Sequence, residues 1–227
     1  MARKSLPLAV TIPRVVLRPF VRCIRGREHL PDGAYILAAN HSSLLDGVVL
    51  GSETAWAQYR PVHMVSVAGP FRHPLWGWFL KSARCIPLQK ASREGSEAML
   101  RQALRFLAMG EGVGILPEGH IGSARRLRRL RPGVALLALE SGAPVVPTGI
   151  RGSAEVLPLG RRRPRLGRRI EVEYGAPLRF PAACARYHGA PRAERIRLVD
   201  AVVEQVGRAM ADLCGKEPPP IPRRSSA

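Results

Sequence analysis

The sequence has no uninterrupted run of eighteen apolar residues, and aromatic side chains make up only 5% of its 227 residues. Without such a run, a conventional membrane-spanning helix is not expected. With so few aromatic rings, stacking platforms for nucleic-acid bases are scarce, and no helix-turn-helix or zinc-finger pattern is present. The chain also lacks a Gly-x-Ser-x-Gly elbow, the nucleophile motif of many lipid hydrolases.

Cysteine and lysine are both scarce, with four residues of each. The cysteines have no spacing typical of metal ligands, so we expect free thiols. Arginine is abundant instead, and 36 Lys and Arg against 17 Asp and Glu give a formal net charge of +19. A surface of this sign attracts polyanions, which makes nucleic acid, anionic lipid headgroups and phosphate-bearing substrates candidate partners.

Apolar runs of strand length alternate with helical patterns along the chain. The expected strands cover 34–39, 62–67, 85–88, 113–116, 144–150 and 169–174. The expected helices cover 46–56, 74–82, 94–109, 132–141 and 193–213. This alternation predicts an α/β fold in which a largely parallel central sheet carries helices on both faces, within a single domain.

The two ends of the chain differ in composition from the middle. Residues 1–23 are apolar but interrupted by prolines and arginines, which predicts either an amphipathic arm on a membrane surface or an arm packed on the core. Residues 24–214 form the predicted globular domain. Residues 215–227, with three consecutive prolines and two arginines, are predicted to be a disordered tail.

A histidine and an aspartate follow the first expected strand at a fixed short distance. The block is Asn-His-Ser-Ser-Leu-Leu-Asp, with His41 in the loop and Asp46 where a helix is expected to begin. On one straight helix these side chains would diverge, but a strand–loop–helix turn can bring them together. Asp46 would then accept from one imidazole nitrogen and leave the other as a base.

A second block places a carboxylate at the end of a later strand. Glu118 follows the apolar run 113–116 and is itself followed by Gly119, which allows a ligand to approach the backbone closely. The densest basic run of the chain, 125–131, comes directly afterwards, and its leucines recur every three residues as on one helical face. Its arginines either contact lipid or substrate phosphate, or simply form a solvated basic face.

Six blocks in a fixed order resemble the lysophospholipid (acylglycerophosphate) acyltransferase family. They are Gly26–Pro31, Asn40–Asp46, Ile86–Lys90, Leu116–Gly119, Pro144–Ile150 and Tyr174–Leu178. The resemblance implies an O-acyltransferase of phospholipid biosynthesis that acylates a lysophospholipid such as 1-acylglycerol 3-phosphate. His41 would deprotonate the acceptor hydroxyl and Asp46 would orient His41. The acyl donor would be acyl-CoA or acyl carrier protein, with no cofactor and no metal.

The resemblance further implies that the acceptor binds at Glu118, Gly119 and the block ending in Lys90, where the family has arginine. A lysine there keeps the charge but loses the planar fork of a guanidinium. The family also has arginine where this chain has Ile121, which cannot bind phosphate. The basic run would then supply the phosphate ligand, for which we take Arg125 and Arg126, or the acceptor differs.

Three other functions compete with this one. Acylation or remodelling of another lipid or glycolipid acceptor fits the same blocks. A basic nucleic-acid-binding protein is suggested by charge alone, and we expect no nucleic-acid partner. A lipid hydrolase lacks its nucleophile motif. The expected setting is peripheral or monotopic attachment to an anionic membrane surface on its cytoplasmic face.

Overall fold

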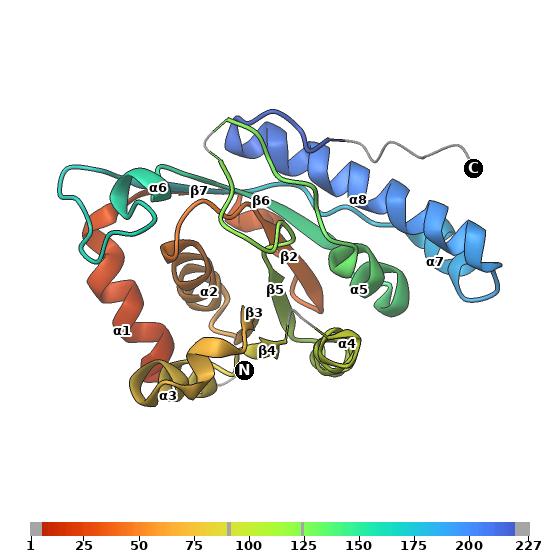
Figure 1. The fold of residues 1–227 in the computed structure, drawn as a ribbon, viewed down its shortest axis with the longest axis horizontal. Coiled ribbons are helices and arrows are strands. Elements are labelled where there is room, and N and C mark those ends of the chain that lie inside the picture. Colours follow the sequence, from red (N-terminus) through yellow and green to blue (C-terminus); the bar gives the residue numbers. More distant parts are fainter. Residues whose placement is uncertain (1–5, 90–91, 124, 221–227) are drawn as a thin grey trace.

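The computed structural model describes residues 6–89, 92–123 and 125–220, and one seven-stranded sheet forms its centre (Figure 1). The strands are β1 (Val21–Arg25), β2 (Tyr35–Ala39), β3 (Val62–Val67), β4 (Ile86–Leu88), β5 (Gly112–Ile115), β6 (Val145–Arg151) and β7 (Ile170–Tyr174). Their order is β1-β7-β6-β2-β5-β3-β4. Only β6 and β7 pair antiparallel among these strands, so the expected largely parallel sheet is confirmed.

Helices cover both faces of the sheet, as the sequence predicted. They are α1 (Leu8–Leu17), α2 (Leu45–Gln58), α3 (Pro74–Ser82), α4 (Arg93–Ala108), α5 (Gly133–Ser141), α6 (Ser153–Val156), α7 (Pro181–Tyr187) and α8 (Arg192–Cys214). Side chains of α4, α5, α7 and α8 join one buried cluster, and those of α1, α2 and α6 join the other. Figure 1 shows α1, α2 and α3 on one side of the sheet and α5, α7 and α8 on the other.

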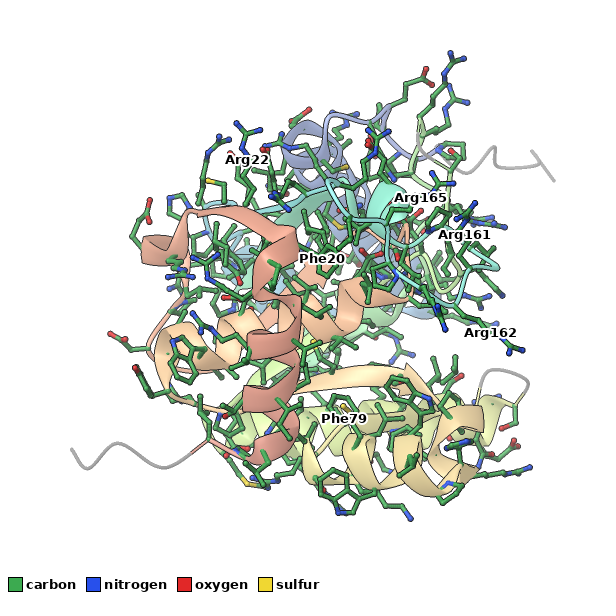
Figure 2. All side chains as sticks on the ribbon, turned by 90° about the vertical axis from the view of Figure 1, so that its left-hand side faces the viewer. Phe20, Arg22, Phe79, Arg161, Arg162 and Arg165 are labelled. Atoms are coloured by element: carbon green, nitrogen blue, oxygen red, sulfur yellow. The ribbon has the colours of Figure 1, made fainter. Side chains whose placement is uncertain are left out.

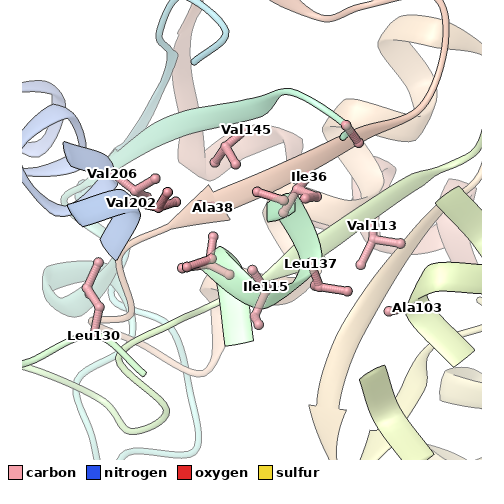
Figure 3. Close-up of a cluster of buried hydrophobic side chains, with 14 of the residues drawn as sticks. Ile36, Ala38, Ala103, Val113, Ile115, Leu130, Leu137, Val145, Val202 and Val206 are labelled. Carbon is pink, nitrogen blue, oxygen red and sulfur yellow. The ribbon is translucent and has the colours of Figure 1, made fainter. Parts of the chain in front are cut away.

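The central strand β2 connects the two hydrophobic clusters. All five of its residues are buried, and successive side chains point to opposite faces because a strand has a period of two. Ile36 and Ala38 therefore belong to the cluster under α5 and α8, which Figure 3 shows together with Val113 and Val145 of the neighbouring strands. Leu37 belongs to the opposite cluster. Buried on both faces, β2 reads in sequence as a continuous apolar run.

The N-terminal arm departs from the prediction at its C-terminal boundary. Residues 21–23 belong to the edge strand β1, which pairs in parallel with β7. This strand was not predicted from the sequence, because two of its five residues are arginines on an exposed edge. The arm before it is a regular helix, α1, despite the internal Pro13, and it buries Val10 and Leu17 against the core.

Two further segments also differ from expectation. Residues 125–131 form no helix. Leu127 and Leu130 are nevertheless both buried, while the arginines between and around them are exposed. Residues 216–220, predicted to be disordered, pair with this segment: Glu217 donates its backbone N–H to Arg125 O and accepts from Leu127 N. The rest of the predicted tail, residues 221–227, lies outside the described residues.

Candidate active site

The strand order brings the two sequence blocks to one edge of the sheet. β2 and β5 are parallel neighbours, so the loops that follow their carboxyl ends emerge side by side. The loop after β2 carries His41 and leads into α2. The loop after β5 carries Glu118. β6 flanks β2 on its other side, which makes this edge the junction of three strands.

Asn40 fixes the loop after β2 to β6. Its side-chain oxygen accepts from Ile150 N at 2.7 Å, and its amide nitrogen donates to Ile150 O at 2.9 Å. The same nitrogen lies 3.2 Å from Ser42 Oγ. Asn40 is fully buried, so these bonds satisfy an amide that water cannot reach. The residue before His41 is thereby held in one orientation.

His41 and Asp46 form the predicted pair. His41 Nδ1 lies 3.1 Å from Asp46 Oδ2, and Asp46 stands in the first turn of α2. Asp46 Oδ2 also accepts from Ser42 N at 2.5 Å and Ser43 N at 2.7 Å. The carboxylate is completely buried, whereas the imidazole keeps 19% of its surface exposed. The turn between strand and helix thus brings together side chains that a straight helix would separate.

This geometry assigns distinct tasks to the two imidazole nitrogens. A carboxylate oxygen can only accept, so Nδ1 is the donor in the bond to Asp46. In the neutral ring the other nitrogen, Nε2, then carries the lone pair that accepts a proton. The arrangement can act as a general base whose orientation is set by a buried carboxylate.

The Glu118 carboxylate accepts hydrogen bonds from the backbone of two loops in this structure. Its side chain is buried, with Oε1 accepting from His41 N at 2.8 Å and Oε2 accepting from Arg128 N at 2.8 Å. The loops are joined a second time, because Gly122 N donates to His41 O at 2.7 Å. A Cβ on Gly122 would lie 2.4 Å from Glu118 Oε2, so the close approach requires glycine. Glu118 therefore positions His41, and its direct contact with an acceptor stays a prediction.

Of the other predicted acceptor-binding residues, Gly119, Arg125 and Arg126 lie between β5 and α5. Gly119 has a left-handed φ of 69°, and a Cβ there would meet Arg131 Nε at 2.5 Å. Arg125 is exposed, and its carbonyl accepts from the C-terminal segment. Arg126 is also exposed and binds Glu217 Oε2 through two guanidinium nitrogens, at 2.7 and 2.6 Å. Lys90 lies outside the described residues.

One cation near the site, Lys216, was not among the residues predicted from the sequence. Lys216 Nζ donates to Ser42 Oγ and to Ser123 O, both at 2.8 Å. Burial raises the pKa of the neighbouring Cys214 thiol, and the Lys216 ammonium partly opposes that shift. Lys216 and Ser42 are 174 positions apart in the sequence, so no local motif could predict their contact. The only sequence signal for Lys216 was that the chain has just four lysines.

The described part of the chain contains no group of three or more His, Cys, Asp or Glu side chains placed to bind a metal ion. Its four cysteines are all free thiols, as expected. Of the other histidines, His63 is buried between Glu111 Oε2, at 2.7 Å from Nε2, and Arg84 O, at 3.0 Å from Nδ1. Its ring stacks on Phe106, which makes it part of the core.

Known proteins resemble the chain in sequence and in fold. Uncharacterised proteins of Mycobacterium tuberculosis and Mycobacterium bovis are each 30% identical to it over 65% of its length. The chain spans 43% of the length of these relatives. The crystal structure of PlsC, the 1-acyl-sn-glycerophosphate (LPA) acyltransferase from Thermotoga maritima, matches with a TM-score of 0.62 and 20% identity, covering 90% of this chain and 78% of that one. This likeness shows a shared fold.

A family model described as Acyltransferase matches residues 21–151. The match begins at β1 and ends with β6, so it includes both loops that meet at His41 and most of the sheet. It covers more than half of the chain and includes five of the six sequence blocks. The chain therefore belongs to the acyltransferase family.

Proposed function

We propose that the protein transfers a fatty acyl group from a thioester, acyl-CoA or acyl carrier protein, to the hydroxyl of a lysophospholipid such as 1-acylglycerol 3-phosphate. The observation that carries the proposal is the bond from His41 Nδ1 to the buried carboxylate of Asp46. A hydroxyl is a weak nucleophile, and an oriented base is what this transfer needs. Membership of the acyltransferase family supports the same reaction.

In the proposed reaction, His41 Nε2 takes the proton of the acceptor hydroxyl as the oxygen attacks the thioester carbonyl. A C–O bond forms, and the carbonyl π electrons move to its oxygen. When the tetrahedral intermediate collapses, the C–S bond breaks and the sulfur leaves as a thiolate. The imidazolium returns its proton to that sulfur. The step forms an ester and a free thiol, with no covalent enzyme intermediate, no cofactor and no metal.

The acceptor class is supported by two observations of different kinds. PlsC of Thermotoga maritima, named as a 1-acyl-sn-glycerophosphate acyltransferase, shares the fold over most of this chain. The loops around His41 in this protein also carry a high density of cations, since exposed arginines fill much of 125–131. Positive charge beside the base favours an acceptor that carries phosphate.

A membrane surface is the proposed location of the acceptor. α1 exposes an apolar stripe along one side, with residues spaced as on one helical face: Leu8, Ile12, Val15 and Val16. α3 packs beside α1 and exposes Leu75, Trp76 and Trp78. We call these seven side chains the apolar face. Amphipathic helices of this kind lie in the boundary between headgroups and acyl chains, and Trp is common there.

Arginines stand next to the apolar face. Figure 2 looks onto α1, with Phe79 of α3 toward one end of the helix and Phe20 toward the other. Arg161 and Arg162 project outward from the loop between α6 and β7, all of whose residues 161–169 are exposed. The end of this loop is tied to the helix region, since Arg169 donates to Pro19 O at 2.7 Å. Such arginines suit anionic headgroups.

No helix in the described part of the chain is long and apolar enough to cross a membrane. The apolar face and the neighbouring arginines support the proposal of peripheral or monotopic attachment. The cytoplasmic face of the membrane stays the predicted side.

The proposed function is tested by following thioester consumption and ester formation with a panel of lipid acceptors and both donor types. We expect transfer to 1-acylglycerol 3-phosphate or a related lysophospholipid. Turnover of a lipid or glycolipid acceptor without phosphate, combined with none for any lysophospholipid, would contradict the proposed acceptor while keeping the family chemistry.

A further inference from the structure

A lysine from the far end of the chain reaches the loop that carries His41. Lys216 Nζ lies 2.8 Å from Ser42 Oγ, and Ser42 directly follows His41. The same ammonium lies 2.8 Å from Ser123 O in the loop after β5. It therefore stands between the two loops that Glu118 and Gly122 join at His41. An ammonium in this place adds a full positive charge beside the candidate base.

The segment that carries Lys216 is held from two directions. α8 ends at Cys214, and Gly215 takes a left-handed φ of 65°, which reverses the chain. Lys216 N then donates to Ala211 O at 3.0 Å. On the other side, Glu217 pairs its backbone with 125–127 and its carboxylate with the Arg126 guanidinium. Figure 1 shows the loop after β5 reaching the C-terminal end of α8.

The charge of Lys216 is not cancelled where it sits. Within the part of the chain that the structure describes, its two hydrogen-bond partners are a hydroxyl and a carbonyl, and no carboxylate pairs with it. Arg126, by contrast, is paired with Glu217, and Ile121 carries no charge. An ammonium has three donors, so it can bind an anion while keeping contacts to the protein. Being half-buried, it is also less screened than a surface lysine.

We propose that Lys216 binds the phosphate of the acceptor and so makes the enzyme prefer a phosphate-bearing lysolipid. This inference rests on the proposed function and deepens it. Lys216 occupies the role for which the sequence analysis considered Arg125 and Arg126. The C-terminal segment, residues 215–220, then acts as the element that delivers a specificity-determining residue to the site.

The kinetic test replaces Lys216 by Met, which keeps most of the length and removes the charge, and by Arg, which keeps the charge. Acceptor KM is measured with 1-acylglycerol 3-phosphate and with a monoacylglycerol of the same chain, and donor KM is measured alongside. We expect Lys216→Met to raise KM for the phosphate-bearing acceptor by about ten-fold or more, as for loss of a charge-assisted hydrogen bond. Donor KM and the kinetics with monoacylglycerol should stay unchanged.

Two variants control this test. Lys216→Arg should recover most of the affinity, because it restores the cation. Arg208→Ala removes an exposed cation from α8, the helix that precedes Lys216, where it pairs only with Glu204 among the described residues, and it should leave every parameter unchanged. If Lys216→Met changes both acceptors alike, or changes neither, Lys216 merely fastens the C-terminal segment and the inference is wrong.

Binding without turnover separates this inference from the proposed function. Calorimetry with a short-chain 1-acylglycerol 3-phosphate needs no acyl donor, and thermal unfolding checks that each variant is folded. Weaker binding to folded Lys216→Met than to Lys216→Arg would support the phosphate site even if the wild type transferred no acyl group to this acceptor. Equal binding to both variants would overturn it, whatever the activity.

Discussion

Asp46 accepts three hydrogen bonds on one oxygen, from the imidazole of His41 and from the backbone of Ser42 and Ser43. The same atom thus orients the candidate base and shapes the loop that carries it. An aspartate that only capped α2 would not need the imidazole contact. Because the Asp46 side chain is completely buried, water does not compete for these hydrogen bonds, and one carboxylate oxygen can maintain the geometry.

Replacing Asp46 by Asn should therefore reduce kcat strongly. An amide can present its nitrogen to His41 and favour the wrong tautomer, for which a loss of about 10²–10⁴-fold is expected. Acceptor and donor KM should change little, because Asp46 touches neither substrate in this scheme. Steady-state kinetics on folded protein measure the effect, and wild-type kcat in a variant with unchanged melting temperature would contradict the assigned role.

Glu118 leads to a different expectation. Both of its oxygens accept backbone N–H groups, and the amide of Glu118→Gln could satisfy only one of them. An unsatisfied buried donor costs about 1–3 kcal/mol, so the melting temperature should fall. We expect kcat to fall with it and acceptor KM to stay nearly constant. A large rise in acceptor KM at unchanged stability would instead restore Glu118 as a direct acceptor ligand.

At this scale the sequence located His41 and Asp46 because their spacing is local and the turn between them is short. Lys216 could not be located in the same way. Its contact with Ser42 depends on the length of α8, the reversal at Gly215 and the pairing of Glu217 with a distant loop. None of these leaves a local pattern, and the proline-rich composition after it favoured disorder.

Among the secondary-structure elements, buried strands were the easiest to predict. β2 and β5 are buried along their whole length and are therefore apolar throughout. In the edge strand β1 only one residue is buried, and two arginines are exposed. Its sequence therefore lacks the continuous apolar run that marks a buried strand. In the segment 125–131, the three-residue spacing of the leucines suggested a helical face. Leu127 and Leu130 are indeed buried, but they pack from an irregular backbone and not from a helix.

The pair of helices α1 and α3 supports a prediction about membrane attachment. Val16 is 62% exposed on the apolar face, so Val16→Glu places a charge where lipid contact is proposed without disturbing the core. We expect weaker binding to anionic vesicles in a flotation or sedimentation assay. The matched control is Ile196→Glu, at a 50% exposed apolar position on α8, which should bind like wild type. Equal loss in both variants would indicate a general charge effect rather than a docking face.

For the whole molecule, the net charge of +19 sets the expected salt dependence. Electrostatic attraction reaches about 30 Å at 0.01 M ionic strength but only about 8 Å at 0.15 M. Binding to anionic vesicles should therefore weaken as salt is raised, and binding to neutral vesicles should change little. Binding that neither salt nor lipid charge alters would mean that the arginines around α1 play no part in attachment.

Composition and periodicity were sufficient for the architecture of the molecule, because an α/β sheet needs only the alternation of buried strands with helices. They could not determine how the chain ends are used. α1 packs on the core through Val10 and Leu17, which is one of the two alternatives that the sequence left open, and its exposed other side keeps the membrane-surface alternative as a proposal. Residues 215–220, expected to be disordered, instead extend from α8 to the loop of the site.

In the proposed reaction, the buried Asp46 orients His41 as the base for acyl transfer to a lysophospholipid hydroxyl. The most direct measurement is ester formation from an acyl thioester and 1-acylglycerol 3-phosphate, on anionic vesicles, by the wild type and by His41→Ala. We expect product with the wild type and a loss of about 10²-fold or more in kcat for a variant that remains folded by circular dichroism. Turnover by folded His41→Ala at the wild-type rate would show that His41 is not the base.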